Sequence, residues 1–303
     1  MKPAPFTYHA PDDAAEVVGL LAELGDDAKV VAGGQSLVPM LALRLAAFGH
    51  LVDLRRLHEL RGIERRGDSV WIGAGTTQAA VEHSDEVRAA VPLLARATPL
   101  IGHFQIRNRG TVGGSLAHAD AAAEYPAVAL TLDVEMETLS PRGRRTIPAE
   151  RFLSGMWSTA LAEDELLTGV NIPVWEGRCG FAVEEFARRS GDFAIAGATV
   201  ALRVDDEGRL DRCAIGLFGL GPTAVRARAA EAALLGTDAF AVSAEDVGRT
   251  ATEGLTSVPA DLHGSADYRI RVGAAMVARA WHRAVQEAVH GAAHEAEQEA
   301  AHG

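Results

Sequence analysis

Apolar and polar residues follow two different periods along the chain, and these periods predict its first helices and strands. Residues 14–24, AAEVVGLLAEL, carry apolar side chains at helical spacing between an acidic turn and a glycine, which predicts an amphipathic helix. The short apolar runs at 28–32 and 50–54 predict buried strands, with a helix expected over 41–48. A strand, a helix and a strand in this order imply that the two strands pair in parallel.

The middle of the chain begins with a predicted hairpin. Residues 62–75, GIERRGDSVWIGAG, turn at Gly67 and Asp68, which are residue types common in hairpin turns. A glycine-bounded break follows at 110–114. The other elements predicted in this part are helical segments over 77–97 and 119–131 and strands at 133–140 and 166–172.

The pattern changes near residues 173–180. Beyond this point the segments FAVEEFARR, GATVALRV and RCAIGLF alternate with the period of half-buried strands, which predicts an antiparallel sheet. Three helices are then expected, at 223–235, 243–254 and 267–285. The chain is therefore predicted to have an α+β fold in two parts.

The change of pattern places a domain boundary near residue 176. The first domain is predicted at 1–176, with subdomains at about 1–55 and 56–176, and the second at 177–285. Residues 286–303 are rich in Ala, Glu and His but have no apolar stripe, which favours a flexible tail over a metal-binding tract.

Composition excludes several classes of function. The formal net charge of −12 argues against a nucleic-acid partner, because phosphate binding requires clustered Lys and Arg. No apolar stretch is long enough to cross a bilayer, and residues 1–9 lack the apolar core of a signal peptide, so a cytoplasmic protein is expected. Cys179 and Cys213 form no CxxC pair and cannot supply a four-thiolate cluster. Any iron or zinc centre is therefore expected on another chain.

A first candidate binding segment follows the strand predicted at 28–32. It consists of Ala32, Gly33, Gly34, Gln35, Ser36 and Leu37. The glycines can simply make a tight turn, because glycine enters positive φ at low cost. They can also let main-chain N–H groups reach an anion, with Gln35 and Ser36 adding side-chain hydrogen bonds and a following helix adding its dipole. Taken alone, the segment favours the turn.

A second glycine segment changes this balance. Residues 108–126, NRGTVGGSLAHADAAAEYP, include Gly110, Thr111, Gly113, Gly114 and Ser115. Two such segments in one domain suit a ligand with two phosphates, because a diphosphate requires many short donors and little positive side-chain charge. Neither segment is a GxGxxG or a GxxxxGK[ST] motif, so the sequence predicts neither a Rossmann nor a P-loop site.

Two acidic residues follow the second glycine pair. Asp120 and Glu124 lie four residues apart on the predicted helix, so their side chains should project from one face. They could accept hydrogen bonds from ribose or ribityl hydroxyls. Alternatively, they are acids that stabilise the N-terminal end of a helix.

Three segments carry a resemblance to a known family. AGGQSLVPMLALRL at 32–45, IGHFQIRNRGTVGGSLAHADAAAEYPAV at 101–128 and EEFARRSGDFAIAG at 184–197 resemble the FAD-binding medium subunit of molybdenum hydroxylases, the group that includes carbon monoxide dehydrogenase and the FAD module of xanthine dehydrogenase. The resemblance runs from about residue 3 to 285. It implies a vanillyl-alcohol-oxidase-type (PCMH-type) FAD-binding domain of two α/β subdomains, followed by a smaller α/β domain of the carbon monoxide dehydrogenase flavoprotein C-terminal type with an antiparallel sheet.

The resemblance also implies how FAD is bound. Residues 32–37 and 110–115 would cradle the pyrophosphate, and Ser115 stands where relatives often carry Asn. Glu124 matches the acid that binds ribityl or adenosine hydroxyls, with Asp120 as a second candidate. Ile101 and Leu161 match apolar residues beside the isoalloxazine, although isolated Ile and Leu are common in a core. No catalytic side chain and no metal ligand is expected on this chain.

In such a family the chain is an electron-transfer subunit and not a complete enzyme. The implied partners are a small subunit with two [2Fe–2S] clusters and a large subunit with a molybdenum-pterin cofactor, as a dimer of heterotrimers. One alternative is a freestanding FAD oxidoreductase of the same fold, for which His103, His118 or Cys179 would supply acid/base chemistry or a covalent flavin link. Another is a structural protein that binds no cofactor. The sequence identifies neither the reducing substrate nor the terminal acceptor, and it gives no role to His103, His118 or Arg189.

Overall fold

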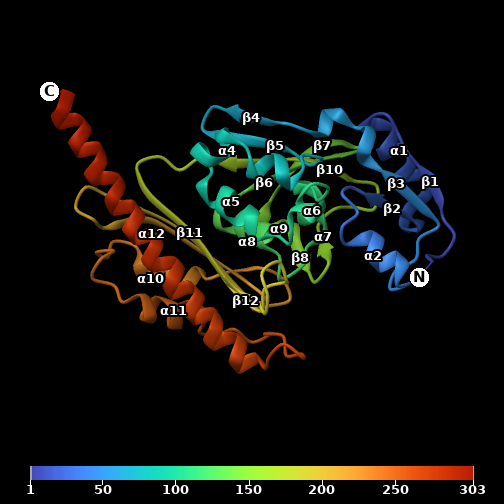
Figure 1. Ribbon diagram of the computed structural model, residues 1–303. Helices are drawn as coiled ribbons and strands as arrows, with labels where there is room; N and C mark the ends of the chain where they lie inside the picture. Colours follow the sequence, from blue (N-terminus) through green and yellow to red (C-terminus); the bar gives the residue numbers. More distant parts are fainter. Residues whose placement is uncertain (1, 303) are drawn as a thin grey trace.

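The N-terminal part of the chain is a small parallel sheet with one covering helix. The computed structural model describes residues 2–302, and the side chains of residues 2–289. The strands are β1 (Thr7–His9), β2 (Ala28–Val31) and β3 (His50–Asp53), in the order β1-β3-β2. Helix α1 (Ala14–Leu24) joins β1 to β2 and buries its apolar face against the sheet (Figure 1). The predicted helix at 14–24 and the parallel pairing of β2 with β3 are confirmed.

The helix between β2 and β3 differs from the prediction. Helix α2 spans Leu37–Ala42, whereas the sequence predicted a helix over 41–48. Pro39 is tolerated in the first turn of this helix, where its missing N–H has no intrahelical acceptor. The helix cannot continue through Arg44, which has a left-handed backbone with φ of 58°. The glycine segment therefore leads directly into α2.

The middle of the chain contains a five-stranded antiparallel sheet and a small two-stranded one. The five strands, in sheet order, are β4 (Ile63–Arg66), β5 (Ser69–Gly73), β10 (Leu166–Pro173), β6 (Glu135–Ser140) and β7 (Gly143–Pro148). The two short strands are β8 (Leu153–Gly155) and β9 (Ser158–Thr159). The predicted hairpin is confirmed as β4 and β5, with Gly67 at φ of 62°. Strand β7 was missed because five of its six residues are polar, glycine or proline and only Ile147 is buried.

Helices cover this sheet and form the main core. They are α3 (Gln78–Glu82), α4 (Asp85–Ala90), α5 (Pro92–Ala97), α6 (Phe104–Arg107), α7 (Val112–His118), α8 (Glu124–Thr131) and α9 (Ala149–Phe152). Four short 3₁₀ turns complete the region up to residue 100: Gly25–Asp27, Leu54–Arg56, His58–Leu60 and Thr98–Leu100. Every residue of α8 is buried, and Phe152 packs in the same core. The helix predicted over 119–131 begins only at Glu124, because Ala119 adopts a left-handed conformation that ends α7 and a turn follows it.

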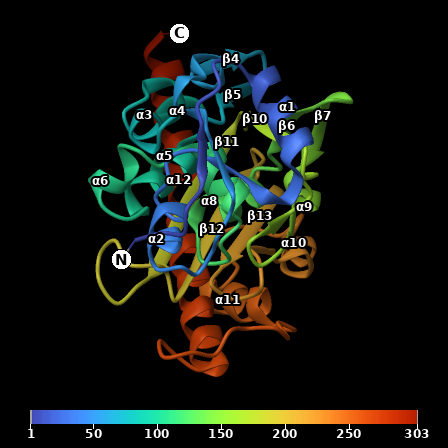
Figure 2. The same cartoon turned by 90° about the vertical axis from the view of Figure 1, so that its right-hand side faces the viewer.

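The C-terminal part is an antiparallel sheet backed by helices. Its strands are β11 (Arg178–Phe186), β12 (Ala196–Val204), β13 (Leu210–Phe218) and β14 (Val225–Arg226), and its helices are α10 (Arg228–Leu234), α11 (Ala244–Thr252) and α12 (Ala266–His302). Figures 1 and 2 show α12 running across this sheet beside β11. Trp281 on α12 is buried in this second core. The three predicted antiparallel strands are confirmed.

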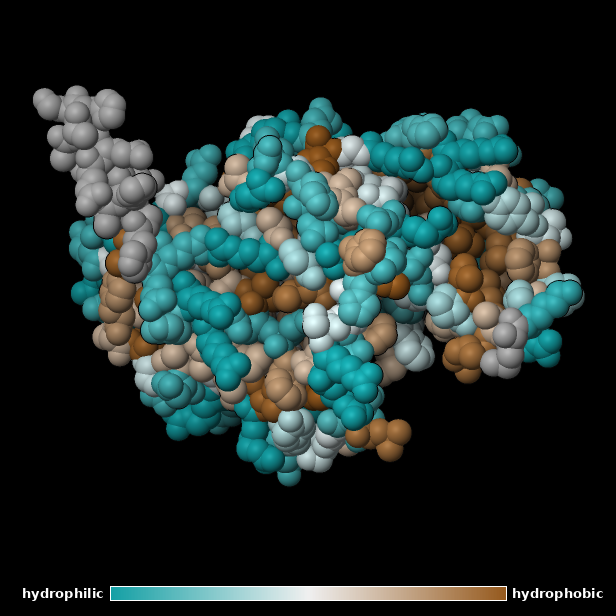
Figure 3. Space-filling view, in the orientation of Figure 1, coloured by the Kyte–Doolittle hydropathy of each residue, from teal (hydrophilic) through white to brown (hydrophobic). Residues whose placement is uncertain are grey.

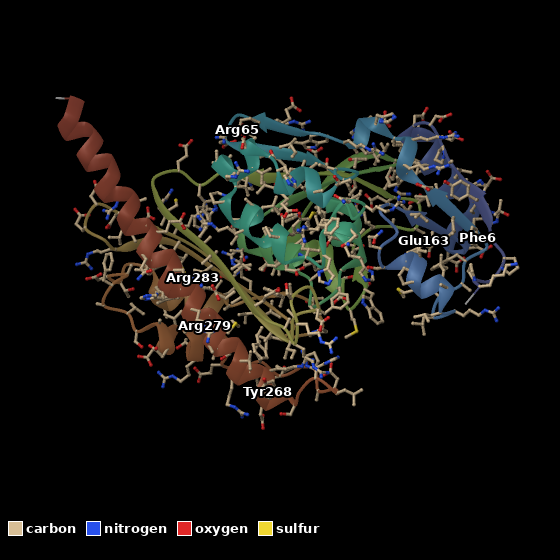
Figure 4. All side chains as sticks on the ribbon, viewed as in Figure 1. Phe6, Arg65, Glu163, Tyr268, Arg279 and Arg283 are labelled. Carbon is tan, nitrogen blue, oxygen red and sulfur yellow. The ribbon has the colours of Figure 1, made fainter. Side chains whose placement is uncertain are left out.

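Helix α12 continues past residue 285, where the second domain was predicted to end. Ala288 is buried, and Arg96 of α5 donates to both carboxylate oxygens of Glu287 at 2.6 and 2.7 Å. Arg283 on α12 lies 2.5 Å from Glu184 on β11 (Figure 4). The side chains of residues 290–303, on which the predicted tail depends, lie outside the described residues. No helix in the described part of the chain is long and apolar enough to cross a membrane.

Candidate cofactor-binding site

A cavity of about 780 Å³ lies between the N-terminal sheet and the helices of the middle region. Figure 3 shows an apolar hollow near the N-terminal sheet, at the right of the view. Glu163, labelled in Figure 4, belongs to the wall of the cavity. All of the residues predicted to bind a ligand line this cavity: Ala32, Gly33, Gly34, Gln35, Ser36, Leu37, Ile101, Gly110, Thr111, Gly113, Gly114, Ser115, Asp120, Glu124 and Leu161. The fold therefore brings together segments separated by up to about 130 positions.

The first glycine segment leaves a group of main-chain donors free. In the described part of the chain, the N–H groups of residues 33–37 donate to no protein acceptor. Gly34 has φ of 72°, a conformation that side chains disfavour, and Gln35 Nε2 donates to the carbonyl of Gly33 at 3.0 Å. These unpaired donors precede the first turn of α2, where an anion is favoured. The prediction of an amide-rich anion site fits this segment.

The second glycine segment is built differently from the prediction. Gly113 and Gly114 lie in the first turn of α7, and their N–H groups are used inside the protein. The N–H of Gly113 donates to the carbonyl of Ala74 at 2.9 Å, and that of Gly114 to Oγ1 of the N-cap Thr111 at 3.0 Å. The expectation that this segment offers its glycine amides to a phosphate is therefore wrong for the described conformation. In contrast, Ser115 lines the cavity, and its hydroxyl has no hydrogen-bond partner among the described residues.

Packing explains why the second segment needs glycine. A Cβ on Gly113 would lie 2.4 Å from the Cβ of Ala74, closer than two carbons can approach. A Cβ on Gly114 would lie 3.2 Å from the Cβ of Ala32, in the first segment. The glycine pair thus lets α7 approach both strand β5 and the first glycine segment.

The two acids reach the cavity from different elements. Asp120 lies in the turn between α7 and α8, where its Oδ1 accepts from the N–H of Ala122 at 2.8 Å, and Glu124 is the first residue of α8. The prediction that both project from one helix face is wrong, because left-handed Ala119 separates the two helices. Both side chains nevertheless line the cavity.

Burial changes the protonation of Glu124. Removal from water, together with nearby Glu185 and Asp120, raises the pKa of Glu124 to about 8. Burial also raises the pKa of Glu185 to about 7. Glu124 therefore keeps its proton near neutral pH in the ligand-free chain, so it can donate a hydrogen bond to a hydroxyl as well as accept one.

The candidates for acid/base or covalent chemistry are not gathered in the cavity. His118 lines it, and burial lowers the pKa of His118, so its imidazole is neutral at neutral pH. His103 caps α6 and is exposed, with its ring against Gly191. Cys179 lies on β11, and burial raises the pKa of its thiol to about 11. Of these three, only His118 lies in the cavity wall.

The cavity wall also contains residues that were not predicted as site residues, among them three with polar or aromatic side chains. Lys29, Gln78 and Trp157 line the cavity, and the buried Oε1 of Gln78 has no hydrogen-bond partner in the described part of the chain. Trp157 is exposed and has a left-handed backbone with φ of 55°. Only Lys29 carries a local signal, as a charged residue inside an otherwise apolar strand. The others belong to the cavity because of tertiary packing.

Comparison with known families decides the kind of ligand. A family model described as the FAD-binding domain in molybdopterin dehydrogenase matches residues 4–175. The chain belongs to this FAD-binding family. A second model, described as the CO dehydrogenase flavoprotein C-terminal domain, matches residues 181–284. The resemblance seen in the sequence is confirmed.

Members of the FAD-binding family match nearly the whole chain. The carbon monoxide dehydrogenase medium chain of Hydrogenophaga pseudoflava is 39% identical over 284 residues, covering 94% of this chain and 98% of that one. Subunit alpha of the 6-hydroxypseudooxynicotine dehydrogenase complex of Paenarthrobacter nicotinovorans is 41% identical over 288 residues, covering 95% and 97%.

A solved structure confirms the predicted fold class. The carbon monoxide dehydrogenase of Hydrogenophaga pseudoflava, in a form that lacks the Mo-pyranopterin moiety of its molybdenum cofactor, superimposes with a TM-score of 0.92. The two chains are 41% identical in this comparison, which covers 95% of this chain and 99% of the matched one. The fold is thus a PCMH-type FAD-binding domain followed by a smaller α/β unit with an antiparallel sheet.

The cavity residues of this family member fit FAD. The amides at 33–37 and the hydroxyls of Ser36 and Ser115, none of which has a partner among the described residues, suit a ligand rich in phosphate oxygens. The unpartnered Oε1 of Gln78 suits a ligand that also carries donors. Apolar Ile101 and Leu161 in the same wall suit a planar ring system.

Proposed function

We propose that this chain is the FAD-carrying electron-transfer subunit of a molybdenum hydroxylase. The observation that carries the proposal is the row of free N–H groups at 33–37, which lines the same cavity as Ser115 in a chain of the FAD-binding family. Bound FAD would supply the ability to accept electrons singly and to pass them on. The protein's task is then to bind, orient and shield this cofactor, and no side-chain base is required.

Each part of the cavity would take a different part of FAD. The amides and the hydroxyl of Ser36 in residues 32–37 would bind the diphosphate, and Ser115 would add a second hydroxyl. Residues 110–114 would hold Ser115 at the right distance from residues 32–37. Glu124 and Asp120 would bind ribityl or ribose hydroxyls, and Ile101 and Leu161 would contact the ring. Their common location in the cavity wall supports these roles.

The proposed partners carry the metals. The relatives are a medium chain and one subunit of a named complex, which supports a multi-subunit assembly. Among the described residues no group of three His, Cys, Asp or Glu side chains is arranged to hold a metal. From the likeness to these relatives, we propose two [2Fe–2S] clusters on a small partner and the molybdenum-pterin cofactor on a large one, as a dimer of heterotrimers in the cytoplasm. Cys179 and Cys213 are both free thiols, which supports a location in the cytoplasm, where cysteines are kept reduced.

The reducing substrate would be chosen by the large partner. Relatives of similar identity include a carbon monoxide dehydrogenase chain and a chain of a 6-hydroxypseudooxynicotine dehydrogenase complex, so similarity of this subunit does not select a substrate. We propose carbon monoxide, an N-heterocycle or an aldehyde as the substrate classes.

Co-purification tests this proposal. The chain is expressed with the genes that neighbour its own and isolated by a tag on this chain alone. The expected result is a yellow-brown complex with one FAD per tagged chain and both iron and molybdenum, whose flavin absorbance bleaches when substrate is added. A chain that binds no FAD alone or in the complex would contradict the proposal. So would a flavin-loaded chain that never associates with metal-containing subunits.

A further inference from the structure

Arg107 holds a turn of main chain at the edge of the cavity. Its side chain, at the end of α6, is only 11% exposed and forms a two-point pair with Glu82 of α3. Nε lies 2.7 Å from Glu82 Oε2, and Nη2 lies 3.0 Å from Oε1. The remaining Nη1 donates to the carbonyl oxygens of Pro99, Ile101 and Gly102 at 3.3, 3.2 and 3.1 Å. One guanidinium thus joins a carboxylate to three carbonyls.

The turn that Arg107 holds forms part of the cavity wall. Ile101 and Gly102 both line the cavity. Gly102 has φ of 51°, and a Cβ there would lie 3.2 Å from Cγ1 of Ile106. Three carbonyls that point toward one another repel unless a positive donor lies between them, and Arg107 is that donor. The position of Ile101 therefore depends on a side chain that is not in the cavity wall.

Glu82 keeps the guanidinium in place. Its hydrogen bond from Arg107 lowers the pKa of the Glu82 carboxyl, so the pair is charged at neutral pH. Two parallel hydrogen bonds to a carboxylate fix the plane of a guanidinium. A lysine ammonium cannot form this bidentate pair. The orientation of Nη1 toward the three carbonyls follows from this fixed plane.

The other end of the same turn is fixed by buried hydroxyls. Thr98 Oγ1 lies 3.0 Å from the hydroxyl of Tyr125, and it donates to the carbonyl of Leu94 at 2.7 Å. Tyr125 is fully buried next to Glu124 on α8. The 98–102 turn is thus anchored at both ends, by Tyr125 on one side and by Arg107 on the other.

We propose that Arg107, oriented by Glu82, is a positioning residue for FAD. It fixes the 98–102 turn and thereby the contact of Ile101 with the flavin ring. This inference rests on the proposed placement of FAD in the cavity. Arg107 itself touches no cofactor in this account. Loss of the guanidinium leaves the turn free to relax, which changes the surroundings of the ring before it changes the fold.

Arg107→Gln, Arg107→Lys and Glu82→Gln test the proposal against a matched control, Arg96→Gln. Arg96 also forks a carboxylate, Glu287, and donates to a main-chain carbonyl, that of Phe181, but none of these residues lines the cavity. FAD affinity, the visible absorbance bands of bound flavin and its reduction potential are measured for each purified chain, with thermal unfolding as a check of folding.

Arg107→Gln is expected to bind FAD about tenfold more weakly, because it loses a charged hydrogen bond. The visible absorbance bands and the reduction potential of its bound flavin should also change. Arg107→Lys is expected to show the same band shift, because an ammonium cannot fork Glu82, and it carries the test if the Gln variant does not fold. Glu82→Gln should give a smaller shift in the same direction. Arg96→Gln should lose thermal stability while its flavin stays like that of the wild type.

The exchanged pair Glu82→Arg with Arg107→Glu separates positioning from a plain ion pair. It restores opposite charges but gives the three carbonyls no donor at position 107, so the altered flavin bands should persist. The proposal would be overturned if Arg107→Gln kept the flavin bands and potential of the wild type, or if the exchanged pair regained them. The proposed function would still stand in that case, provided that the wild-type chain binds FAD. A wild-type chain that binds no FAD would overturn both.

Discussion

The ideal Cβ position of Gly33 lies 2.1 Å from the carbonyl oxygen of Arg109, and 2.7 Å from the Cα of Gly110. The two glycine segments are therefore in main-chain contact, although more than 70 positions separate them. Gly33 does not have a positive φ, so its requirement for glycine comes from this contact and not from a turn. The contact sets the distance between the free amides of 33–37 and the hydroxyl of Ser115.

Gly33→Ala tests this contact. The added methyl group has to displace main chain, which is expected to cost about 1–3 kcal/mol of stability and to lower FAD affinity more than tenfold. Gly19→Ala is the matched control, because nothing lies within 4 Å of its Cβ position on the exposed face of α1. That variant should gain about 0.5–1 kcal/mol and keep its FAD. Chemical denaturation and the ratio of flavin to protein measure both effects, and equal FAD retention by the two variants would refute the contact's role.

Ser115→Ala tests a hydroxyl that has no hydrogen-bond partner in the part of the chain that the structure describes. Because none of the described groups bonds to this hydroxyl, the stability of the apoprotein should stay unchanged. FAD affinity should fall about fivefold, the effect of losing one hydrogen bond of about 1 kcal/mol. Titration of apoprotein with FAD, followed by flavin fluorescence, gives the affinity. A loss of apoprotein stability without a change in affinity would show that Ser115 is structural.

Glu124 should make the ligand-free chain less stable as pH rises. Its pKa is raised from 4.5 to about 8 in the folded chain, so the unfolded chain loses this proton first. The stability due to the neutral carboxyl is complete below pH 4.5 and is lost as pH rises toward 8. Glu124→Gln cannot ionise and should therefore be more stable than the wild type at pH 8, with little difference at pH 4.5.

Urea denaturation of apoprotein between pH 4.5 and 8.5 measures this effect. Glu124→Gln with Glu185→Gln is a useful second variant, because the pKa of Glu185 is also raised, to about 7. The double variant should have the flattest pH dependence in this window. A difference between wild type and Glu124→Gln that grows toward low pH would contradict the assigned protonation state.

The sequence predicts those parts of the fold that local residue order determines. The alternation in β11, β12 and β13, the amphipathic helix α1 and the parallel strands β2 and β3 each depend on a period that neighbouring residues reveal. The candidate site residues could be named because the glycine segments resemble a family, and the fold places them all in one cavity wall.

The rest depends on contacts that sequence order does not show. Ala119 enters a left-handed conformation without being glycine, so the separation of Asp120 from the helix of Glu124 could not be predicted. The approach of Glu185 to Glu124 arises when β11 and β12 pack against the middle of the chain. The use of the Gly113 and Gly114 amides inside the protein depends in part on Ala74, on a distant strand end. In each case tertiary packing decides the outcome.

Amide NMR of the ¹⁵N-labelled apoprotein, titrated with FAD, tests the central claim most directly. The free N–H groups of residues 33–37 should shift strongly and become protected from exchange as one FAD binds, whereas the Gly113 and Gly114 amides, already bonded within the protein, should change less. Stoichiometric FAD binding that leaves the 33–37 amides unshifted and unprotected would contradict the account.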